Sequence, residues 1–397
     1  MRLKKVILTS LFLSLPCINA YAKDYIPGEV HHPIHLKKLP DSAGTNPTGI
    51  SPQQIKRAYT IDQVVAQGKG QVIGIINAYD HPNIESDLAI FNNAFNLPAC
   101  STANSCFQKI YADNNKPRTD SGWAAEIALD VEWAHAIAPQ AKIMLVEASS
   151  NSLQDMYRAV QVAINNGANI ISMSWGAAES GSQVNTNNLF KSPAITFVAA
   201  SGDSGYGVSY PASSPFVLGV GGTTLYMDAS GNRRAETAWS GSGGGVSKYE
   251  PMPAYQQSYP IPSNQWQMRG VPDVSYHANP NTGYAYFNSI RDVNGHIGWG
   301  VVGGTSAGAP QWAGIIAIAN SIRRTSIPGM NALIYKLANN RYDLTFYDII
   351  YGKNGNCGYY CEANYNYDYV TGLGSPHALY TINMIIRGGQ LTNNKLS

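Results

Sequence analysis

The stretch Gly303–Pro310, with the sequence GGTSAGAP, sets the hydroxyl of Ser306 between a glycine turn and the start of an apolar segment. Residues 311–320, which follow, are small and apolar enough to form a buried helix. The N-terminal amides of that helix and the positive end of its dipole would point at negative charge developing beside Ser306. We therefore interpret Ser306 as a candidate nucleophile. A serine that only caps a helix in a strand-to-helix turn would give the same pattern.

A nucleophilic serine needs a base, and none of the eight histidines lies in an HGT-type sequence. The segment Ser121–Pro139 carries Glu126 and Asp130 instead, and on a helix these two residues share a face. If they are buried, the two carboxyls are coupled, so one keeps a proton while the other is ionised. Such a pair can act as a general base. A solvated acidic face is the alternative, but the neighbouring Trp, Ile, Ala and Leu residues argue against it.

A third candidate, Asp203, lies in the glycine-flanked stretch Ala199–Gly205. This stretch follows the apolar run 194–198, which is typical of a buried parallel strand. Catalytic groups collect at the carboxyl ends of such strands. On its own, Asp203 could equally form an Asx-turn.

Taken together, these motifs resemble the sedolisin family of serine-carboxyl peptidases, which are similar to subtilisins with acidic groups in place of histidine. The resemblance runs through four further segments: Ile50–Tyr59, Gly70–Ile76, Ser172–Gly176 and Thr371–Pro376. It implies four catalytic residues: the nucleophile Ser306, the general base Glu126, its carboxyl partner Asp130 and the oxyanion-site acid Asp203. It also implies a substrate cleft at Ser174–Gly176 and at the glycine-rich loop 240–247, where Trp175 has either a packing or a pocket role.

The acidic residues favour activity at acidic pH. Asp203 could stabilise a tetrahedral oxyanion only while it carries a proton. We predict a secreted serine-carboxyl endopeptidase, hydrolysing peptide bonds in proteins at acidic pH through an acyl-enzyme on Ser306. Tripeptidyl-peptidase action and a non-catalytic secreted binding protein on the same fold are alternatives. A serine hydrolase with His135 as base is disfavoured, because a spacing of five residues turns His135 away from the Asp130 face.

Apolar runs alternate with helical stretches after residue 50, which predicts a parallel sheet covered on both faces. The resemblance implies the same α/β architecture: a subtilisin-like three-layer sandwich with a mainly parallel central sheet. We divide the chain into a signal peptide (1–22), an extended N-terminal lead-in (23–48), a sedolisin-type peptidase domain (49–390) and a C-terminal tail (391–397). Relatives usually carry a large prodomain, which the lead-in cannot hold. Three expectations remain open. Neutral pH keeps the enzyme inactive, a separate partner assists its folding, or the protein needs no such assistance.

A second constellation near the C-terminus has two carboxylates with backbone carbonyls between them, which suits a hard cation. The resemblance implies one Ca²⁺ held by five residues: the side chains of Asp348 and Asp368 and the carbonyls of Ile349, Asn364 and Asn366. The two asparagines stand where relatives usually have glycine, and asparagine best tolerates glycine-like backbone angles. A surface loop rich in Tyr and Asn is the alternative.

The N-terminus predicts export. Three basic residues precede the apolar run Val6–Ile18, and small residues surround a cleavage position near Ala22, as in a secretory signal peptide. The run is too short to span a membrane, so we expect a secreted protein, extracellular or periplasmic, without a membrane anchor. Without these three residues, 24 basic side chains remain against 25 acidic ones, which disfavours nucleic acid. We expect protein or peptide substrates and a monomer.

Four cysteines remain after residue 22. Cys100 lies near Cys106, and Cys357 lies near Cys361, which in an exported protein predicts two local disulfides. A four-cysteine zinc site is the alternative, but neither pair has the usual C-x2-C spacing.

Overall fold

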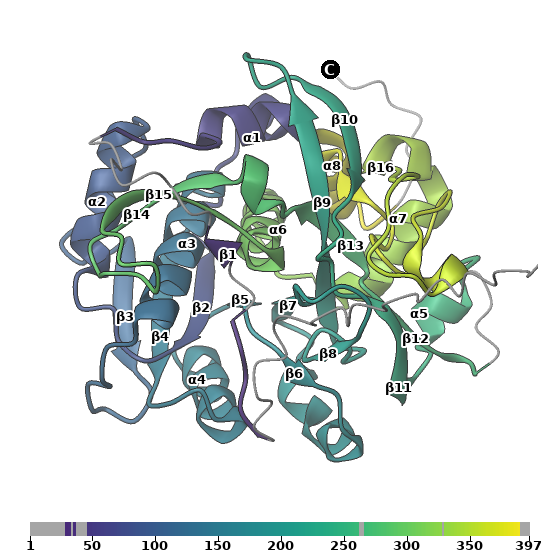
Figure 1. Cartoon of the computed structure of the whole chain (residues 1–397), viewed down its shortest axis with the longest axis horizontal. Coiled ribbons are helices and arrows are strands. Elements are labelled where there is room, and N and C mark those ends of the chain that lie inside the picture. Colours follow the sequence, from purple (N-terminus) through teal and green to yellow (C-terminus); the bar gives the residue numbers. More distant parts are fainter. Residues whose placement is uncertain (1–27, 33–34, 37–45, 262–265, 328, 390–397) are drawn as a thin grey trace, which may run out of the picture.

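The computed structural model describes residues 28–32, 35–36, 46–261, 266–327 and 329–389. The predicted cleavage position and C-terminal tail lie outside these residues. An eight-stranded sheet forms the centre, in the order β10-β9-β7-β5-β2-β4-β3, with β13 also paired to β9 (Figure 1). All of its strand pairs are parallel except β10 with β9. The strands are β2 (Val72–Ala78), β3 (Phe107–Tyr111), β4 (Lys142–Ala148), β5 (Ile170–Met173), β7 (Thr196–Ala200), β9 (Val217–Met227), β10 (Arg233–Ala238) and β13 (Val274–His277).

Helices cover both faces of this sheet, which confirms the predicted α/β three-layer architecture. The alternation along β2 shows the two faces: Ile73 and Ile75 join the core beneath α3 and α6, whereas Ile76 and Ala78 join the core beneath α4. The helices are α1 (Pro52–Ala58), α2 (Ile84–Ala94), α3 (Ser121–Ile137), α4 (Leu153–Asn165), α5 (Ala254–Gln257), α6 (Gly308–Arg323), α7 (Met330–Thr345) and α8 (Ala378–Ile386).

Smaller elements surround the sandwich. The pairs β11 (Gly245–Pro251) with β12 (Met268–Val271), β16 (Phe346–Tyr347) with β17 (Ser375–Pro376), and β6 (Ala177–Ala178) with β8 (Ser209–Tyr210) are two-stranded. A three-stranded sheet joins β1 (His35–Leu36), β15 (Gly298–Gly303) and β14 (Tyr284–Asn288). The 3₁₀ helices are η1 (Ile61–Gln63), η2 (Gly181–Phe190), η3 (Pro280–Thr282), η4 (Thr305–Ala307) and η5 (Gly358–Cys361).

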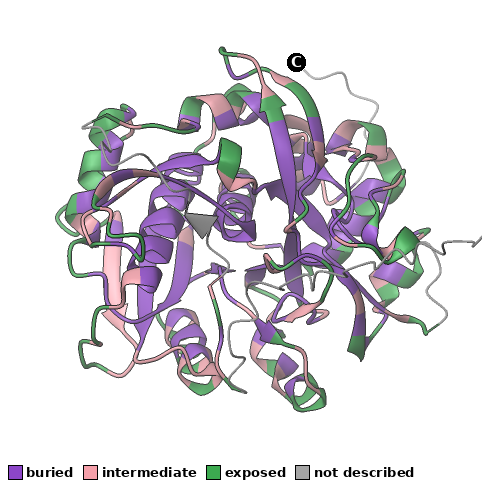
Figure 2. Cartoon of the chain, in the orientation of Figure 1, coloured by how far each residue is buried: buried purple, intermediate pink, exposed green. Residues whose placement is uncertain are grey.

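The helix α3 runs through the interior. The side chain of Asp120 caps it by accepting hydrogen bonds from the amides of Gly122 and Trp123, and it ends at Ile137, two residues before Pro139. Every residue from Gly122 to Ile137 is buried (Figure 2). A helix that is buried on all sides sets any carboxylate it carries inside the protein, away from bulk water.

The quoted stretch forms a glycine turn followed by a helix, as predicted, and a strand leads into it. β15 ends at Gly303, η4 contains Ser306, and α6 follows from Gly308. Glycine is required at 303, because a Cβ there would lie 2.5 Å from the carbonyl oxygen of Ala278. Gly304 has a φ of 115°, a backbone angle that residues with a side chain rarely adopt. The backbone is therefore packed too tightly at this turn for larger residues.

The described part of the lead-in lies across the carboxyl-end side of the sheet (Figure 1). The amide of His31 donates to Gly176 O (2.9 Å), and the amide of Gly176 donates back to His31 O (3.0 Å). Further along the chain, β1 pairs antiparallel with the end of β15, with His35 opposite Gly303. The lead-in therefore contacts two segments that flank Ser306.

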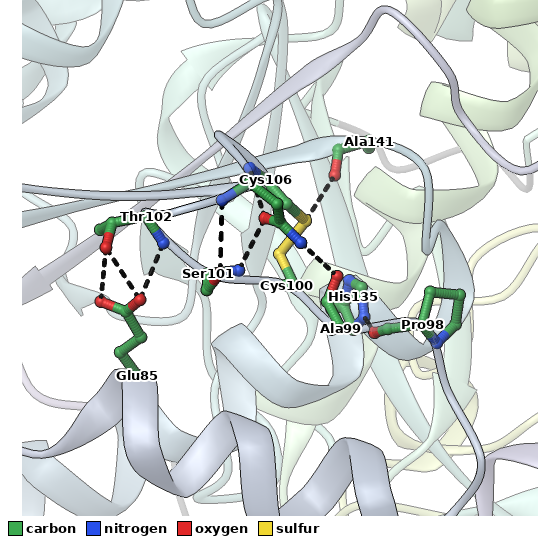
Figure 3. Close-up of a disulfide and its surroundings, with 10 residues drawn as sticks. Glu85, Pro98, Ala99, Cys100, Ser101, Thr102, Cys106, His135 and Ala141 are labelled. Atoms are coloured by element: carbon green, nitrogen blue, oxygen red, sulfur yellow. Dashed lines mark hydrogen bonds between the residues drawn. A yellow bond between two sulfur atoms is a disulfide. The ribbon is translucent and has the colours of Figure 1, made fainter.

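Both predicted disulfides are present, Cys100–Cys106 and Cys357–Cys361. The first lies beside the C-terminal turn of α3 (Figure 3), where Nε2 of His135 is 2.9 Å from Pro98 O. Burial lowers the pKa of His135 to about 4. Within the described ranges, none of the helices is both long and apolar enough to cross a membrane.

Candidate active site

Three segments bring the four predicted catalytic side chains together. Glu126 and Asp130 come from α3, Ser306 from η4, and Asp203 from the loop after β7. The first three are completely buried, and Asp203 is half-buried with its Oδ2 shielded from solvent. Ser306, Asp130 and Asp203 all lie close enough to Glu126 to shift the pKa of its carboxyl. Sequence reasoning thus identified residues that do meet in space.

Burial rules out a solvated acidic face for the α3 pair. The pKa of Glu126 is raised well above its usual value, first by burial and then by the neighbouring charge of Asp130. Burial also raises the pKa of Asp130, to about 7. Two carboxyls in this position behave as a coupled pair: one ionises first, and its charge makes the other hold its proton more strongly.

The Ser306 hydroxyl and the Glu126 carboxyl are close but not yet bonded. Ser306 lowers the pKa of Glu126, as a nearby donor does. However, neither Ser306 Oγ nor either oxygen of Glu126 has a partner of hydrogen-bond geometry among the described residues. Nucleophile–base contacts are often loose before substrate binds and tighten in the complex. The spacing is therefore compatible with the predicted roles of Ser306 as nucleophile and Glu126 as base.

Two neutral side chains hold Asp130. Ser174 Oγ donates to Asp130 Oδ1 (2.7 Å), and Asn77 Nδ2 donates to Asp130 Oδ2 (3.0 Å). Sequence analysis placed Ser174 in the substrate cleft and did not single out Asn77. The available signal was that Asn77 is the first polar residue after the apolar run 72–76.

Asp203 is anchored by Thr305, the residue before Ser306. Its Oδ1 accepts hydrogen bonds from the amide of Thr305 (2.8 Å) and from Thr305 Oγ1 (2.7 Å). Burial raises the pKa of Asp203 to about 8, and the Thr305 donors oppose that rise. Asp203 is therefore protonated below that pH and can donate a hydrogen bond to negative charge beside Ser306.

Trp175 packs in the core. It is fully buried, and its indole Nε1 donates to Ile76 O (3.0 Å). Of the two roles considered for it, the packing role is the one observed. The next residue, Gly176, exposes its backbone amide and carbonyl to the lead-in, so the edge that follows Trp175 can pair with an extended chain.

One lead-in side chain reaches the pair itself. His32 Nδ1 lies 3.7 Å from Glu126 Oε2, and its ring packs edge-on against Trp123 with centroids 5.1 Å apart. A Cβ at Gly122 would come within 2.8 Å of His32 Nε2, so glycine there makes room for the ring. No sequence motif pointed to His32, because its contact with Glu126 is long-range.

The predicted calcium ligands are also gathered by the fold. The amide of Asn366 donates to both oxygens of Asp348 (3.1 Å each), and the Tyr342 hydroxyl joins Asp348 Oδ1 (2.8 Å) to Asn366 O (3.1 Å). Asp368 is buried and accepts from the amides of Val370 and Thr371. The carboxylate of Asp348 and the carbonyl of Asn366 thus converge on one hydroxyl.

This donor set fits a hard cation, since all the predicted ligand atoms are oxygens. Asn366 has a φ of 65°, the left-handed conformation expected where relatives have glycine. The same expectation is wrong for Asn364, which has no such φ. Its amide instead donates to Asp368 Oδ2 (3.2 Å), a bond made without a left-handed turn.

An α/β/α sandwich with a buried serine between a strand end and a central helix defines the subtilisin-like class of hydrolase folds. A model described as the subtilase family matches residues 68–340, and the chain belongs to that family. Kumamolisin of Bacillus sp. (strain MN-32) is 32% identical over 84% of this chain and 63% of its own length. Sedolisin of Pseudomonas sp. (strain 101) is 28% identical over 76% of this chain and 56% of its own.

Tripeptidyl-peptidase 1 of Dictyostelium discoideum is 28% identical over 83% of this chain and 57% of its own length. The chain thus spans about six tenths of these curated relatives. The solved structure of Pseudomonas sedolisin, a serine-carboxyl proteinase complexed with pseudo-iodotyrostatin, matches with a TM-score of 0.75 and 27% identity. That match covers 87% of this chain and all of the sedolisin chain. The resemblance to sedolisins is confirmed.

Proposed function

We propose that the chain is a serine-carboxyl endopeptidase that cleaves peptide bonds through an acyl-enzyme on Ser306. The observation that carries this proposal is the buried Glu126–Asp130 pair beside Ser306, because two coupled carboxyls in the interior have little structural use and suit proton transfer. A non-catalytic binding protein on the same fold would have no need of such a pair buried beside a serine.

In the proposed mechanism, ionised Glu126 takes the proton of Ser306 as Oγ attacks the peptide carbonyl carbon. Ionised Asp130 stabilises the protonated Glu126, and protonated Asp203 donates to the tetrahedral oxyanion. Glu126 then gives its proton to the leaving amine, which departs and leaves the acyl group on Ser306. In the second half, Glu126 takes a proton from water, and the hydroxide attacks the ester. The proton then returns to Ser306 Oγ.

We propose acidic pH for this chemistry, since Asp203 must be protonated, whereas the need for Glu126 to ionise sets the lower limit of the pH range. We also propose that the protein is exported and that residues 49–390 form its peptidase domain. Relatives include a tripeptidyl-peptidase, and what supports endopeptidase action is the extended pairing edge at Gly176. The test compares a peptide substrate blocked at its N-terminus with the same peptide left free. Internal cleavage of the blocked peptide supports endopeptidase action. Cleavage of the free peptide alone, three residues from its N-terminus, would support the tripeptidyl-peptidase alternative.

Asp203 should set the alkaline end of the activity profile. Its pKa is about 8, so wild-type kcat should fall as pH rises through that value and the carboxyl ionises. Asp203→Ala, which has no donor, should lose about 10² to 10³ in kcat at acidic pH. Asp203→Asn keeps an amide donor that does not titrate, so its remaining activity should exceed that of the alanine variant and lack the alkaline fall. An alkaline fall that Asp203→Asn retains would assign this step to another group.

We further propose that one Ca²⁺ binds through Asp348 and Asp368 and the carbonyls of Ile349, Asn364 and Asn366. The ion would offset the burial that raises the pKa of both carboxyls, so it would stabilise the segment that leads to β17.

A chelator should therefore lower the melting temperature. A site held at a hundredfold excess of calcium over its Kd contributes about 2.7 kcal/mol of folding free energy, and removal of the ion withdraws it. Asp348→Ala should melt like the chelated protein and ignore added calcium. Asp343→Ala is the control. It removes an exposed carboxylate five positions before Asp348 in the sequence, and this variant should respond to calcium as wild type does. Melting curves that the chelator leaves unchanged, with no metal in the purified protein, would refute the site.

A further inference from the structure

We propose that Asn77 and Ser174 are positioning residues that keep Asp130 ionised, so that the mobile proton of the pair belongs to Glu126. This inference rests on the proposed function. It adds to that function a reason why one of two similar carboxyls is the base and the other its charged partner.

The fold brings the two donors to Asp130 from adjacent strands. Asn77 lies near the carboxyl end of β2, and Ser174 directly follows β5, which pairs in parallel with β2. Both side chains are fully buried. Because parallel strands end at the same edge of the sheet, these donors meet the face of α3 that carries the pair.

The hydrogen bonds are unequal between the two carboxyls. Asp130 accepts from Ser174 at one oxygen (2.7 Å) and from Asn77 at the other (3.0 Å). Neither oxygen of Glu126 has such a donor among the described residues. Donors stabilise a carboxylate and do little for a carboxylic acid, so negative charge is favoured at Asp130. The pKa shifts agree, since the hydrogen bonds of Ser174 and Asn77 oppose the rise that burial causes in Asp130.

Ser174 also ties the pair to the nucleophile. Its hydroxyl lies 3.2 Å from the carbonyl oxygen of Ser306 while it donates to Asp130. A single side chain therefore contacts both the charged partner of the base and the backbone of the nucleophile. Among the described residues, the titratable groups that face the pair are Asp203, from the loop after β7, and His32, from the lead-in, and both approach Glu126.

The first test is the pH dependence of kcat/KM in Ser174→Ala and Asn77→Ala. Loss of a donor raises the pKa of Asp130, so Asp130 keeps its proton to higher pH and the acidic limb should move upward. One hydrogen bond to a charged group corresponds to about one to two pH units. Ser172→Ala is the matched control, because Ser172 lies on β5, is buried, and has no hydrogen-bond partner for its hydroxyl in the described chain. Its profile should match wild type.

Asn77→Asp should change the opposite limb. A protonated Asp at 77 can still donate to Asp130, so activity at the acidic end should stay near wild type. As the new carboxyl ionises, the donor disappears and like charge is added, so activity should fall at a lower pH than in wild type. Ser174→Thr, which keeps the hydroxyl, should keep the wild-type profile. Equal losses of kcat at every pH in the Ser174 and Asn77 variants would reduce both residues to structural roles and overturn the proposal.

A measurement without turnover separates this proposal from the function itself. In Ser306→Ala, infrared difference spectra report the carbonyl stretch of each protonated carboxyl as the pH is raised. The band lost in an Asp130→Asn background identifies Asp130. We expect that band to persist about one to two pH units higher when Ser174→Ala is added. A band that titrates at the same pH with and without Ser174 would overturn the inference, whatever the activity of the wild-type protein.

Discussion

Ser306→Ala should abolish peptide hydrolysis, with a loss of about 10⁶ in kcat, the scale seen when a catalytic serine is removed from a serine peptidase. The physical reason is that no other described hydroxyl beside Glu126 can form the acyl-enzyme. The measurement is cleavage of an unfolded protein from acidic to mildly alkaline pH, followed by mass spectrometry of the products.

The control for this prediction is Ser275→Ala. Ser275 is equally buried, lies on β13, and its hydroxyl has no hydrogen-bond partner in the described chain. Both variants should melt close to the wild-type temperature. If Ser306→Ala cleaved the substrate as fast as Ser275→Ala, Ser306 would not be the nucleophile and the proposed mechanism would fail.

Glu126→Gln should lose about 10⁴ in kcat, the upper range of general acid–base catalysis, and should keep its fold. The amide has nearly the same shape as the carboxyl but cannot accept the proton of Ser306. No change of pH should restore activity, because the amide does not titrate in this range.

Glu132→Gln offers a matched control on the same helix. Glu132 is also fully buried on α3, and burial likewise raises its pKa far above the usual value, but it accepts hydrogen bonds from the amide of Phe287 instead of facing Ser306. We expect this variant to retain most of kcat while losing some stability. A buried carboxyl on α3 is thus not catalytic merely because it is buried. Full activity in Glu126→Gln would contradict its assignment as the base.

The sequence was most informative where local rules act. The glycine turn at 303–304 and the helical spacing of Glu126 and Asp130 depend only on backbone sterics and helix periodicity, and the structure has both. The full length of β9 was not apparent from the sequence, because its second half is stabilised by pairing with β10. Such pairing leaves little trace in the sequence of either strand alone.

The residues that were missed act across long sequence distances. Asn77 lies 53 positions from Asp130, and the contact exists only because β2 passes beside α3. The difference between Asn364 and Asn366 could not be seen in the sequence, since both are asparagines, which permit a left-handed backbone, but only Asn366 adopts it. Identity at a position shows what a residue can do, whereas its neighbours in space decide which option is used.

The pairing of His31 with Gly176 has a consequence for any affinity measured on this chain. A segment tethered to the same molecule competes with free peptide at an effective concentration in the millimolar range. A free peptide that uses the Gly176 edge must displace His31 first, so its apparent Kd includes the work of peeling the chain's own strand away. An inhibitor that uses this edge is therefore ranked by its affinity relative to that of the lead-in segment at His31. An inhibitor that binds more weakly than this segment shows no measurable binding.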